Sequence, residues 1–254
     1  MLDQLVPNDL FSLLLIFARI GSAVMLLPGF GEVFVPARAR LGIALAISII
    51  VAPVVAQTLP ALPQNLIRLL LVVGGEVGIG LFIGAMTRTM LSALHVAGVV
   101  VGFQTSLSNT TLFDPSNAQQ GVLIAAFLNI LGVLLIFTAD LHRLMLAGLV
   151  DSYRVFHPGE LPPLGDVSGV AVTIVGRSFD LGLQIAAPFV VVGLVFYVGL
   201  GLLSRLMPQI QVFFIAVPLQ TVLGFLVMML TLSAGMLWFL DSFQGAFNGL
   251  FGRT

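Results

Sequence analysis

The stretch LLSRLMPQIQVFFIAVPLQ, residues Leu202–Gln220, contains a polar break between two of the longest charge-free segments of the chain. The apolar segment Leu181–Leu203 comes before this break and Val212–Leu240 comes after it. Pro208 lacks a backbone N–H and crowds the preceding turn, so it can end or kink a helix. The polar residues beside the proline are Ser204, Arg205, Gln209 and Gln211. Such side chains can bond the freed carbonyls or a neighbouring chain, although a loop at a membrane surface explains each of them equally well.

The composition independently places the chain among membrane proteins. Of its 254 residues, 59% are hydrophobic and only 8% are charged, whereas soluble domains carry about 25% charged residues. Lipid or an apolar assembly must therefore cover much of its surface. The net charge of −1 argues against binding to nucleic acid, and the absence of cysteine excludes disulfides and thiolate metal sites.

Seven apolar runs predict an all-α chain. They are Leu10–Leu27, Leu41–Val55, Leu66–Met86, Leu91–Phe103, Val122–Thr138, Leu181–Leu203 and Val212–Leu240. The stretch Leu66–Phe103 can also be divided differently, which would change the count. A bilayer-spanning helix needs about 20 apolar residues, and several runs are shorter. We therefore expect some helices to pack inside an assembly rather than to span lipid independently.

The distribution of arginine gives an expected orientation. If the N-terminus lies outside and each run crosses the membrane, most arginines fall inside, as the positive-inside rule requires. The inside residues are Arg38, Arg40, Arg88, Arg143, Arg154 and Arg253. Arg205 is the exception, because it falls outside.

The segment Asp140–Asp180 is the most polar part of the chain. Asp140 with Arg143, and Asp151 with Arg154, have the spacing of solvated helical pairs. After its prolines, apolar residues at helical spacing between Val167 and Phe179 predict an amphipathic helix on a surface or partner.

The segment Gln104–Gln120 is the second informative stretch. Eleven of its 17 residues are Ser, Thr, Asn or Gln, and Leu112–Phe113 stand at its centre beside Asp114 and Pro115. Asn117 and Gln120 belong to the same polar set. Uncharged polar backbone with an apolar tip suits a segment folded into a cavity. A turn outside the membrane explains the residues about as well.

Glu76 is a carboxylate within an apolar run, which suggests a function by default. A proton relay is one interpretation, and a structural pair with an arginine of another helix or subunit is the one we favour. Small residues flank it at a spacing that permits close helix approach. They are Gly74, Gly78, Gly80 and Gly84.

Catalytic and metal-binding patterns are missing from the sequence. His95, His142 and His157 do not have the spacing of metal ligands, and no nucleophile or phosphate-binding motif is present. We therefore predict no enzyme activity, no catalytic residue, no metal site and no cofactor.

Four segments together resemble the FliR family, whose virulence-associated counterparts are called SctT. Arg205, Pro208 and Gln209 match the arginine-x-x-proline-glutamine segment of that family. Residues Leu26–Pro53 are similar to its proline-glycine turn and basic connection, Gly74–Met86 to its glycine-rich helix, and Val101–Leu123 to its pore loop. The resemblance runs from about Leu10 to the C-terminus, and His157–Gly176 carries no recognised motif.

The resemblance implies an export-gate subunit of the bacterial inner membrane, in a flagellar basal body and projecting toward the periplasm. The whole chain, 1–254, would be one unit of membrane-associated helical hairpins, with a FliP-like portion at 1–180 and a FliQ-like hairpin at 181–254. Its implied partners are FliP and FliQ in a hetero-oligomer, FlhB, FlhA, membrane lipid and unfolded export substrates. The loop Gln104–Gln120 would plug the pore through Leu112 and Phe113. The group Ser204, Arg205, Pro208, Gln209 and Gln211 would make subunit contacts.

Three alternatives stay open at this point. An injectisome homologue would share the fold but carry other cargo. A self-contained secondary transporter would use Glu76 for ion coupling, and would be expected to show inverted repeats, which we do not find. A purely structural membrane scaffold would tolerate changes at Leu112 and Phe113.

Overall fold

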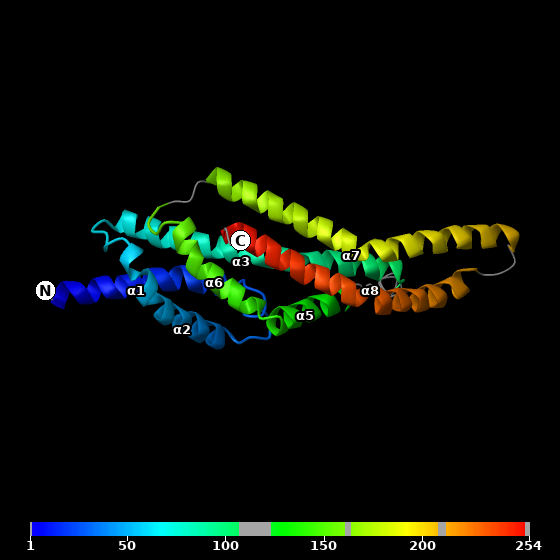
Figure 1. The fold of residues 1–254 in the computed structure, drawn as a ribbon, viewed down its shortest axis with the longest axis horizontal. Coiled ribbons are helices and arrows are strands. Elements are labelled where there is room, and N and C mark those ends of the chain that lie inside the picture. Colours follow the sequence, from blue (N-terminus) through cyan, green and yellow to red (C-terminus); the bar gives the residue numbers. More distant parts are fainter. Residues whose placement is uncertain (1, 107–122, 161–163, 208–211, 252–254) are drawn as a thin grey trace. The chain divides into compact units, whose positions relative to one another are not determined.

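The computed structural model describes residues 2–106, 123–160, 164–207 and 212–251, and every regular element within these ranges is helical. The elements, shown in Figure 1, are α1 (Leu2–Val24), α2 (Ala37–Val55), the 3-10 helix η1 (Ala56–Thr58), α3 (Leu66–Gln104), α5 (Leu123–Thr138), α6 (Leu141–Val155), α7 (Leu164–Leu206) and α8 (Val212–Phe251). The all-α prediction is confirmed.

Three of the helices are much longer than the apolar runs suggested. Helices α3, α7 and α8 contain 39, 43 and 40 residues, about twice the roughly 20 that cross a bilayer. Four helical stretches are long and apolar enough to span a membrane, and α5 with α6 adds a fifth if this bent pair counts as one span. The four stretches are Ala37–Val55, Leu66–Gln104, Gly165–Leu206 and Ala216–Phe251.

Two sequence-based expectations are wrong in detail. The runs Leu66–Met86 and Leu91–Phe103 are parts of one helix, α3. The orientation expected from the arginines counted two membrane crossings there, so its assignment of inside and outside does not hold for residues after Met86. The amphipathic segment Val167–Phe179 is not a separate surface helix, because it is the beginning of α7. No glycine or proline lies between Arg177 and Asp180, so nothing ends the helix before the apolar part begins.

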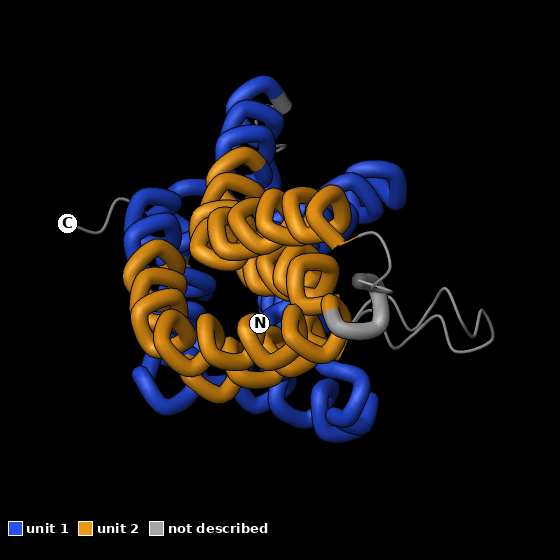
Figure 2. The backbone as a smooth tube through the Cα atoms, turned by 90° about the vertical axis from the view of Figure 1, so that its right-hand side faces the viewer, with its two compact units in different colours: residues 1–90, 136–175, 244–254 blue, residues 91–135, 176–243 orange. Residues whose placement is uncertain are grey.

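The chain forms two compact units, which Figure 2 distinguishes by colour. Unit 1 comprises Met1–Met90, Ile136–Val175 and Gln244–Thr254, and unit 2 comprises Leu91–Leu135 and Gly176–Phe243. Helices α3, α5, α7 and α8 each contribute residues to both units. Neither unit is therefore built from one continuous stretch of sequence.

In unit 1, helix α1 packs against both α2 and α3. Phe11 and Leu15 of α1 form a buried cluster with Val72 of α3. Further along the same pair, a Cβ added at Gly84 would lie 2.8 Å from the carbonyl oxygen of Ala23, and one at Gly80 would overlap the carbonyl of Arg19. Gly80 and Gly84 therefore allow the close approach that the glycine spacing predicted.

Gly74 and Gly78 do not take part in this contact. A Cβ added at either position meets no heavy atom within 4 Å. Glu76, Gly80 and Gly84 lie four residues apart and share one helical face, whereas Gly74 and Gly78 lie on other faces.

Unit 2 packs the second half of α3 against its other helices. A Cβ at Gly98 would lie 2.6 Å from the backbone nitrogen of Ala125 on α5, and one at Gly182 of α7 would lie 2.7 Å from the carbonyl oxygen of Ala93. Phe239 of α8 is fully buried. Glycine is thus used repeatedly where helical backbones meet.

The two kinds of glycine give a matched test of this packing. We expect Gly80→Ala to lower the free energy of unfolding by about 1–3 kcal/mol, because the new methyl group must displace the α1 backbone. Gly78→Ala should raise it by up to about 1 kcal/mol through helix propensity alone. Thermal unfolding of the detergent-solubilised protein measures both, and equal effects would contradict the assigned α1–α3 contact.

Candidate functional site

Arg19 and Glu76 form a buried ion pair inside unit 1. Arg19 is fully buried and Glu76 is 1% exposed. The Nε atom of Arg19 donates to Oε2 of Glu76 at 2.6 Å, and Nη2 donates to Oε1 at 3.1 Å. The partner of Glu76 is therefore an arginine of another helix, α1, and not Arg68 or Arg88 of its own helix.

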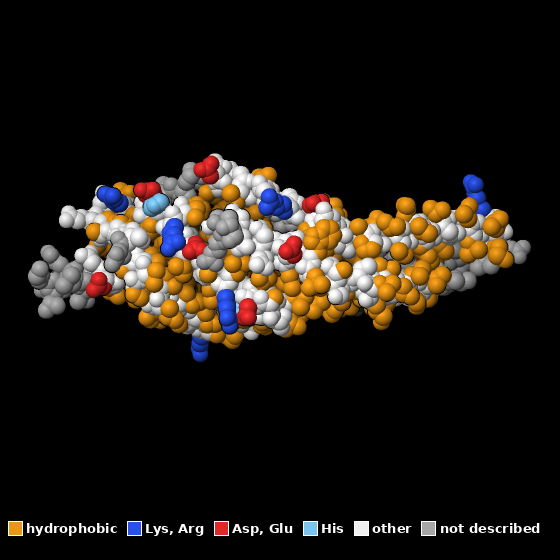
Figure 3. Space-filling view, viewed as in Figure 1, with side chains coloured by type: hydrophobic (Ala, Val, Ile, Leu, Met, Phe, Trp, Pro, Cys, Tyr) orange, Lys and Arg blue, Asp and Glu red, His pale blue; other side chains and the backbone are white. Residues whose placement is uncertain are grey.

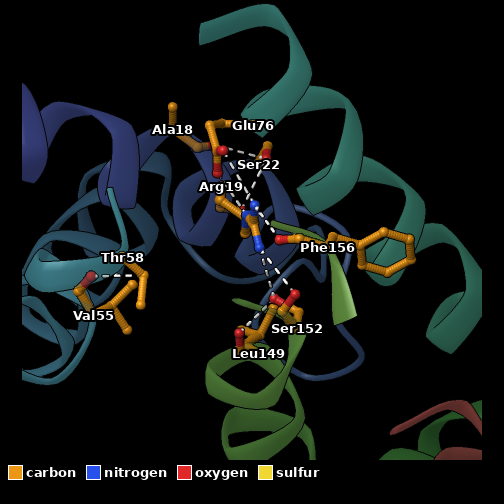
Figure 4. Close-up of polar contacts among 9 residues, drawn as sticks. All are labelled: Ala18, Arg19, Ser22, Val55, Thr58, Glu76, Leu149, Ser152 and Phe156. Atoms are coloured by element: carbon orange, nitrogen blue, oxygen red, sulfur yellow. Dashed lines mark hydrogen bonds and ion pairs between the residues drawn. The ribbon is translucent and has the colours of Figure 1, made fainter. Parts of the chain in front are cut away.

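The remaining N–H groups of Arg19 bind the end of α6 (Figure 4). Nη1 donates to the carbonyl oxygen and to the hydroxyl of Ser152, at 3.1 and 3.4 Å, and Nη2 also donates to the carbonyl of Phe156 at 3.1 Å. Tyr153 places its ring 4.1 Å from the guanidinium carbon. All five donors of the guanidinium thus have an acceptor, and two of these acceptors are backbone carbonyls at the C-terminal end of α6.

The exposed charges of unit 1 are arranged differently. Arg143 lies 3.3 Å from Asp140, and their side chains are 76% and 62% exposed. This is the solvated pair expected from the sequence, and such pairs contribute little to stability. Figure 3 shows further charged side chains on the visible face of the chain.

Gln220 forms a second buried polar centre, in unit 2. It lies on α8 and is 5% exposed. Its Nε2 atom donates to the carbonyl of Gln104 at 2.6 Å and to the hydroxyl of Tyr197 at 3.0 Å. Its Oε1 atom accepts from the Ser106 hydroxyl at 2.6 Å. Both N–H groups and the carbonyl of this amide are therefore used.

Thr221 extends the same contact by donating to the carbonyl of Thr105 at 3.2 Å. Ser106, which follows, has φ of 61°, a left-handed conformation that is uncommon outside glycine. Gly193 of α7 and Gly224 of α8 leave room for the end of α3, because an added Cβ would collide with Gln104 and Thr105. We call the group Gln104, Thr105, Ser106, Tyr197, Gln220 and Thr221 the amide anchor.

The predicted site residues fall into three groups. Gln104 is part of the amide anchor, and Glu76 is in the buried ion pair. Ser204 and Arg205 lie exposed in the last turn of α7, where the Ser204 hydroxyl donates to the carbonyl of Gly201. The other predicted residues, Leu112, Phe113, Asp114, Pro115, Asn117, Gln120, Pro208, Gln209 and Gln211, lie outside the described residues.

Sequence reasoning missed Arg19 and Gln220. Both are polar side chains inside apolar runs. A polar residue in an apolar run indicates a buried polar contact, but this reasoning was applied only to Glu76. Among the described residues, no cluster of His, Asp or Glu could hold a metal ion.

Apolar helices long enough to cross a bilayer, with the buried groups of Arg19, Glu76 and Gln220 paired internally, define an all-α membrane protein. The chain belongs to the bacterial export proteins, family 1, whose model matches residues 10–246. It is 41% identical over 225 residues to the flagellar biosynthetic protein FliR of Caulobacter vibrioides, covering 88% of this chain and 90% of that protein. It is 31% identical over 209 residues to FliR of Escherichia coli K12, covering 81% and 78%. The FliR of Aquifex aeolicus is 27% identical over 248 residues, covering 97% and 95%.

The ion pair should dominate the stability of unit 1. We expect Arg19→Met to cost about 3–5 kcal/mol, because it leaves the Glu76 carboxylate buried without a partner. The double variant Arg19→Met, Glu76→Met should recover much of this loss. Asp140→Asn, at the exposed pair, should change stability by less than about 1 kcal/mol. Unfolding in detergent tests the assignment, and a double variant no more stable than Arg19→Met would contradict it.

The amide anchor should contribute to unit 2. Gln220→Leu leaves the Gln104 carbonyl and the Ser106 hydroxyl unpaired, so we expect a loss of about 1–3 kcal/mol. Gln184→Leu is the control, because Gln184 is exposed and its Nε2 atom donates to Asp180 of the same helix. It should change stability by no more than about 0.5 kcal/mol. Equal losses in the two variants would show that the anchor adds nothing.

Proposed function

We propose that this chain is the pore-forming and gating subunit of a bacterial flagellar type III export apparatus. It acts in the inner membrane, within the flagellar basal body, and projects toward the periplasm. Unfolded export substrates pass through the pore that it helps to build. The observation that carries the proposal is the amide anchor, because it fixes the residues immediately before the predicted plug.

The plug is the segment that continues from this anchor. Leu112 and Phe113 occlude the pore, and the polar residues around them bond neighbouring chains. A plug must be fixed at its base if its tip is to close the same opening after each passage of substrate. Gln220 and Thr221 provide such a fixed base, since they hold the carbonyls of Gln104 and Thr105.

The pore is a shared structure made with partners. FliP and FliQ form the hetero-oligomer with this chain, FlhB contacts it and FlhA lies below. Unit 2 supports this idea, because α7 and α8 expose many large apolar side chains that lipid or protein must cover (Figure 3). On α7 these include Val190, Val191, Leu194, Val195, Val198 and Leu202.

Residues 1–180 would correspond to the FliP-like portion and 181–254 to the FliQ-like hairpin. At the turn of that hairpin, Ser204 and Arg205 are exposed and therefore accessible to a neighbouring subunit. We assign subunit contacts to these two residues together with Pro208, Gln209 and Gln211.

The names of the relatives favour flagellar over virulence cargo, since the three proteins compared above are flagellar biosynthetic proteins. A self-contained ion-coupled transporter is less well supported. Glu76, on which it would depend, is already bound by Arg19.

The test measures both the assembly of the complex and the ion leakage through it. The chain is co-expressed with FliP and FliQ, and the purified complex is weighed by native mass spectrometry. Ion leakage is then measured in cells and in liposomes. Replacing Leu112 and Phe113 by glycine should leave the subunit composition of the complex unchanged and raise leakage several-fold, because the apolar tip is lost.

The matched control exchanges the two residues, Leu112→Phe with Phe113→Leu. This variant keeps the apolar bulk, so its ion leakage should equal that of the unchanged chain. A chain that purifies alone and ignores FliP and FliQ would contradict the proposed assembly. A complex of correct mass in which the glycine variant does not leak would contradict the gating role.

A further inference from the structure

The turn between α1 and α2 exposes two apolar side chains. Val33 is 93% exposed and Phe34 is 74% exposed. Neither packs into unit 1, so burial in the core does not explain them. Apolar side chains at the tip of a turn are typical of segments that insert into another phase.

Helix α2 continues this apolar surface on one face. Its buried residues, Ala44, Ser48, Val51 and Val55, lie on one side. The opposite side exposes Leu41, Leu45, Ile49, Ile50 and Val54. The exposed face is therefore apolar over about four turns, and α2 is one of the stretches long and apolar enough to span a membrane.

Two arginines stand at the end of α2 that adjoins Phe34. Arg38 is exposed, and Arg40 is partly exposed with its Nε atom donating to the carbonyl of Val35 at 3.1 Å. That bond holds the Arg40 side chain beside the apolar tip. Among the described residues, no carboxylate forms an ion pair with either arginine, although Glu32 lies in the same turn.

This arrangement has the charge and polarity of a membrane interface. Arginine places its apolar stem along hydrocarbon and its charge among headgroups, and basic residues near a membrane surface attract anionic lipid. A protein partner would have to bring acidic groups or free carbonyls to both guanidinium groups and an apolar surface beside them. Anionic phospholipid supplies the phosphate and the apolar surface together.

We propose that Val33, Phe34, Arg38, Arg40 and the exposed face of α2 form a lipid-binding surface selective for anionic phospholipids. Phe34 and Val33 insert at the acyl boundary, and the two guanidinium groups bind headgroup phosphates. The exposed apolar face of α2 lies along the acyl chains. This surface is independent of the proposed pore.

The experiment uses tryptophan quenching, because the chain contains a single tryptophan, Trp238. The reporter is the full chain with Phe34→Trp and Trp238→Phe, reconstituted in nanodiscs. The probes are phosphatidylglycerol and phosphatidylcholine, with bromine on the acyl chains of one lipid or the other at equal total content. The wild-type chain, reporting from Trp238 on α8, is the built-in control.

We expect brominated phosphatidylglycerol to quench the reporter more strongly than brominated phosphatidylcholine. Local enrichment should be about fivefold for each arginine, since one basic residue near the surface contributes ~1 kcal/mol. Arg38→Gln with Arg40→Gln should abolish the difference between the lipids, whereas Arg143→Gln, at the exposed pair with Asp140, should leave it unchanged. Trp238 should show no preference.

Equal quenching by both lipids would overturn the selectivity for anionic lipid. Absence of quenching by either lipid would overturn the membrane contact altogether and assign the surface to water or protein. A preference that survives loss of both arginines would also overturn the proposal, because the charge would then come from elsewhere.

Discussion

The burial of one guanidinium sets the construction of unit 1. A charge removed from water must find acceptors for every N–H group, since each one left unpaired costs far more than an ordinary contact contributes. Arg19 meets this requirement only if α3 brings Glu76 to it and the end of α6 brings its carbonyls. The glycines at 80 and 84 make the first approach possible. Three helices far apart in sequence are thereby fixed around one side chain.

Unit 2 solves a similar problem with a neutral group. Gln220 donates to the Gln104 carbonyl and accepts from the Ser106 hydroxyl at the end of α3, and its second donor bond goes to Tyr197 of α7. An amide costs less to bury than an ion, so this anchor holds the backbone without a large desolvation penalty.

The sequence predicted the helical class, the glycine approach and the need for a partner of Glu76. It did not predict that α3 is continuous through Thr87, Arg88 and Thr89. The structure gives the reason: the two threonine hydroxyls donate to the carbonyls of Ile83 and Ala85, so polar residues there do not interrupt the helix. Arg19 and Gln220 were also missed, because their roles depend on partners 57 and 116 residues away. Apolar periodicity carries no information about contacts at that distance.

The interleaving of the two units has a consequence for synthesis of the protein. Gly148 of α6 packs against Phe247, so closely that an added Cβ would overlap the ring, and Phe247 is fully buried. A ribosome makes residue 148 long before residue 247, and unit 1 therefore stays unfinished until Phe247 has been made. A chain released early keeps an uncovered apolar face on α6.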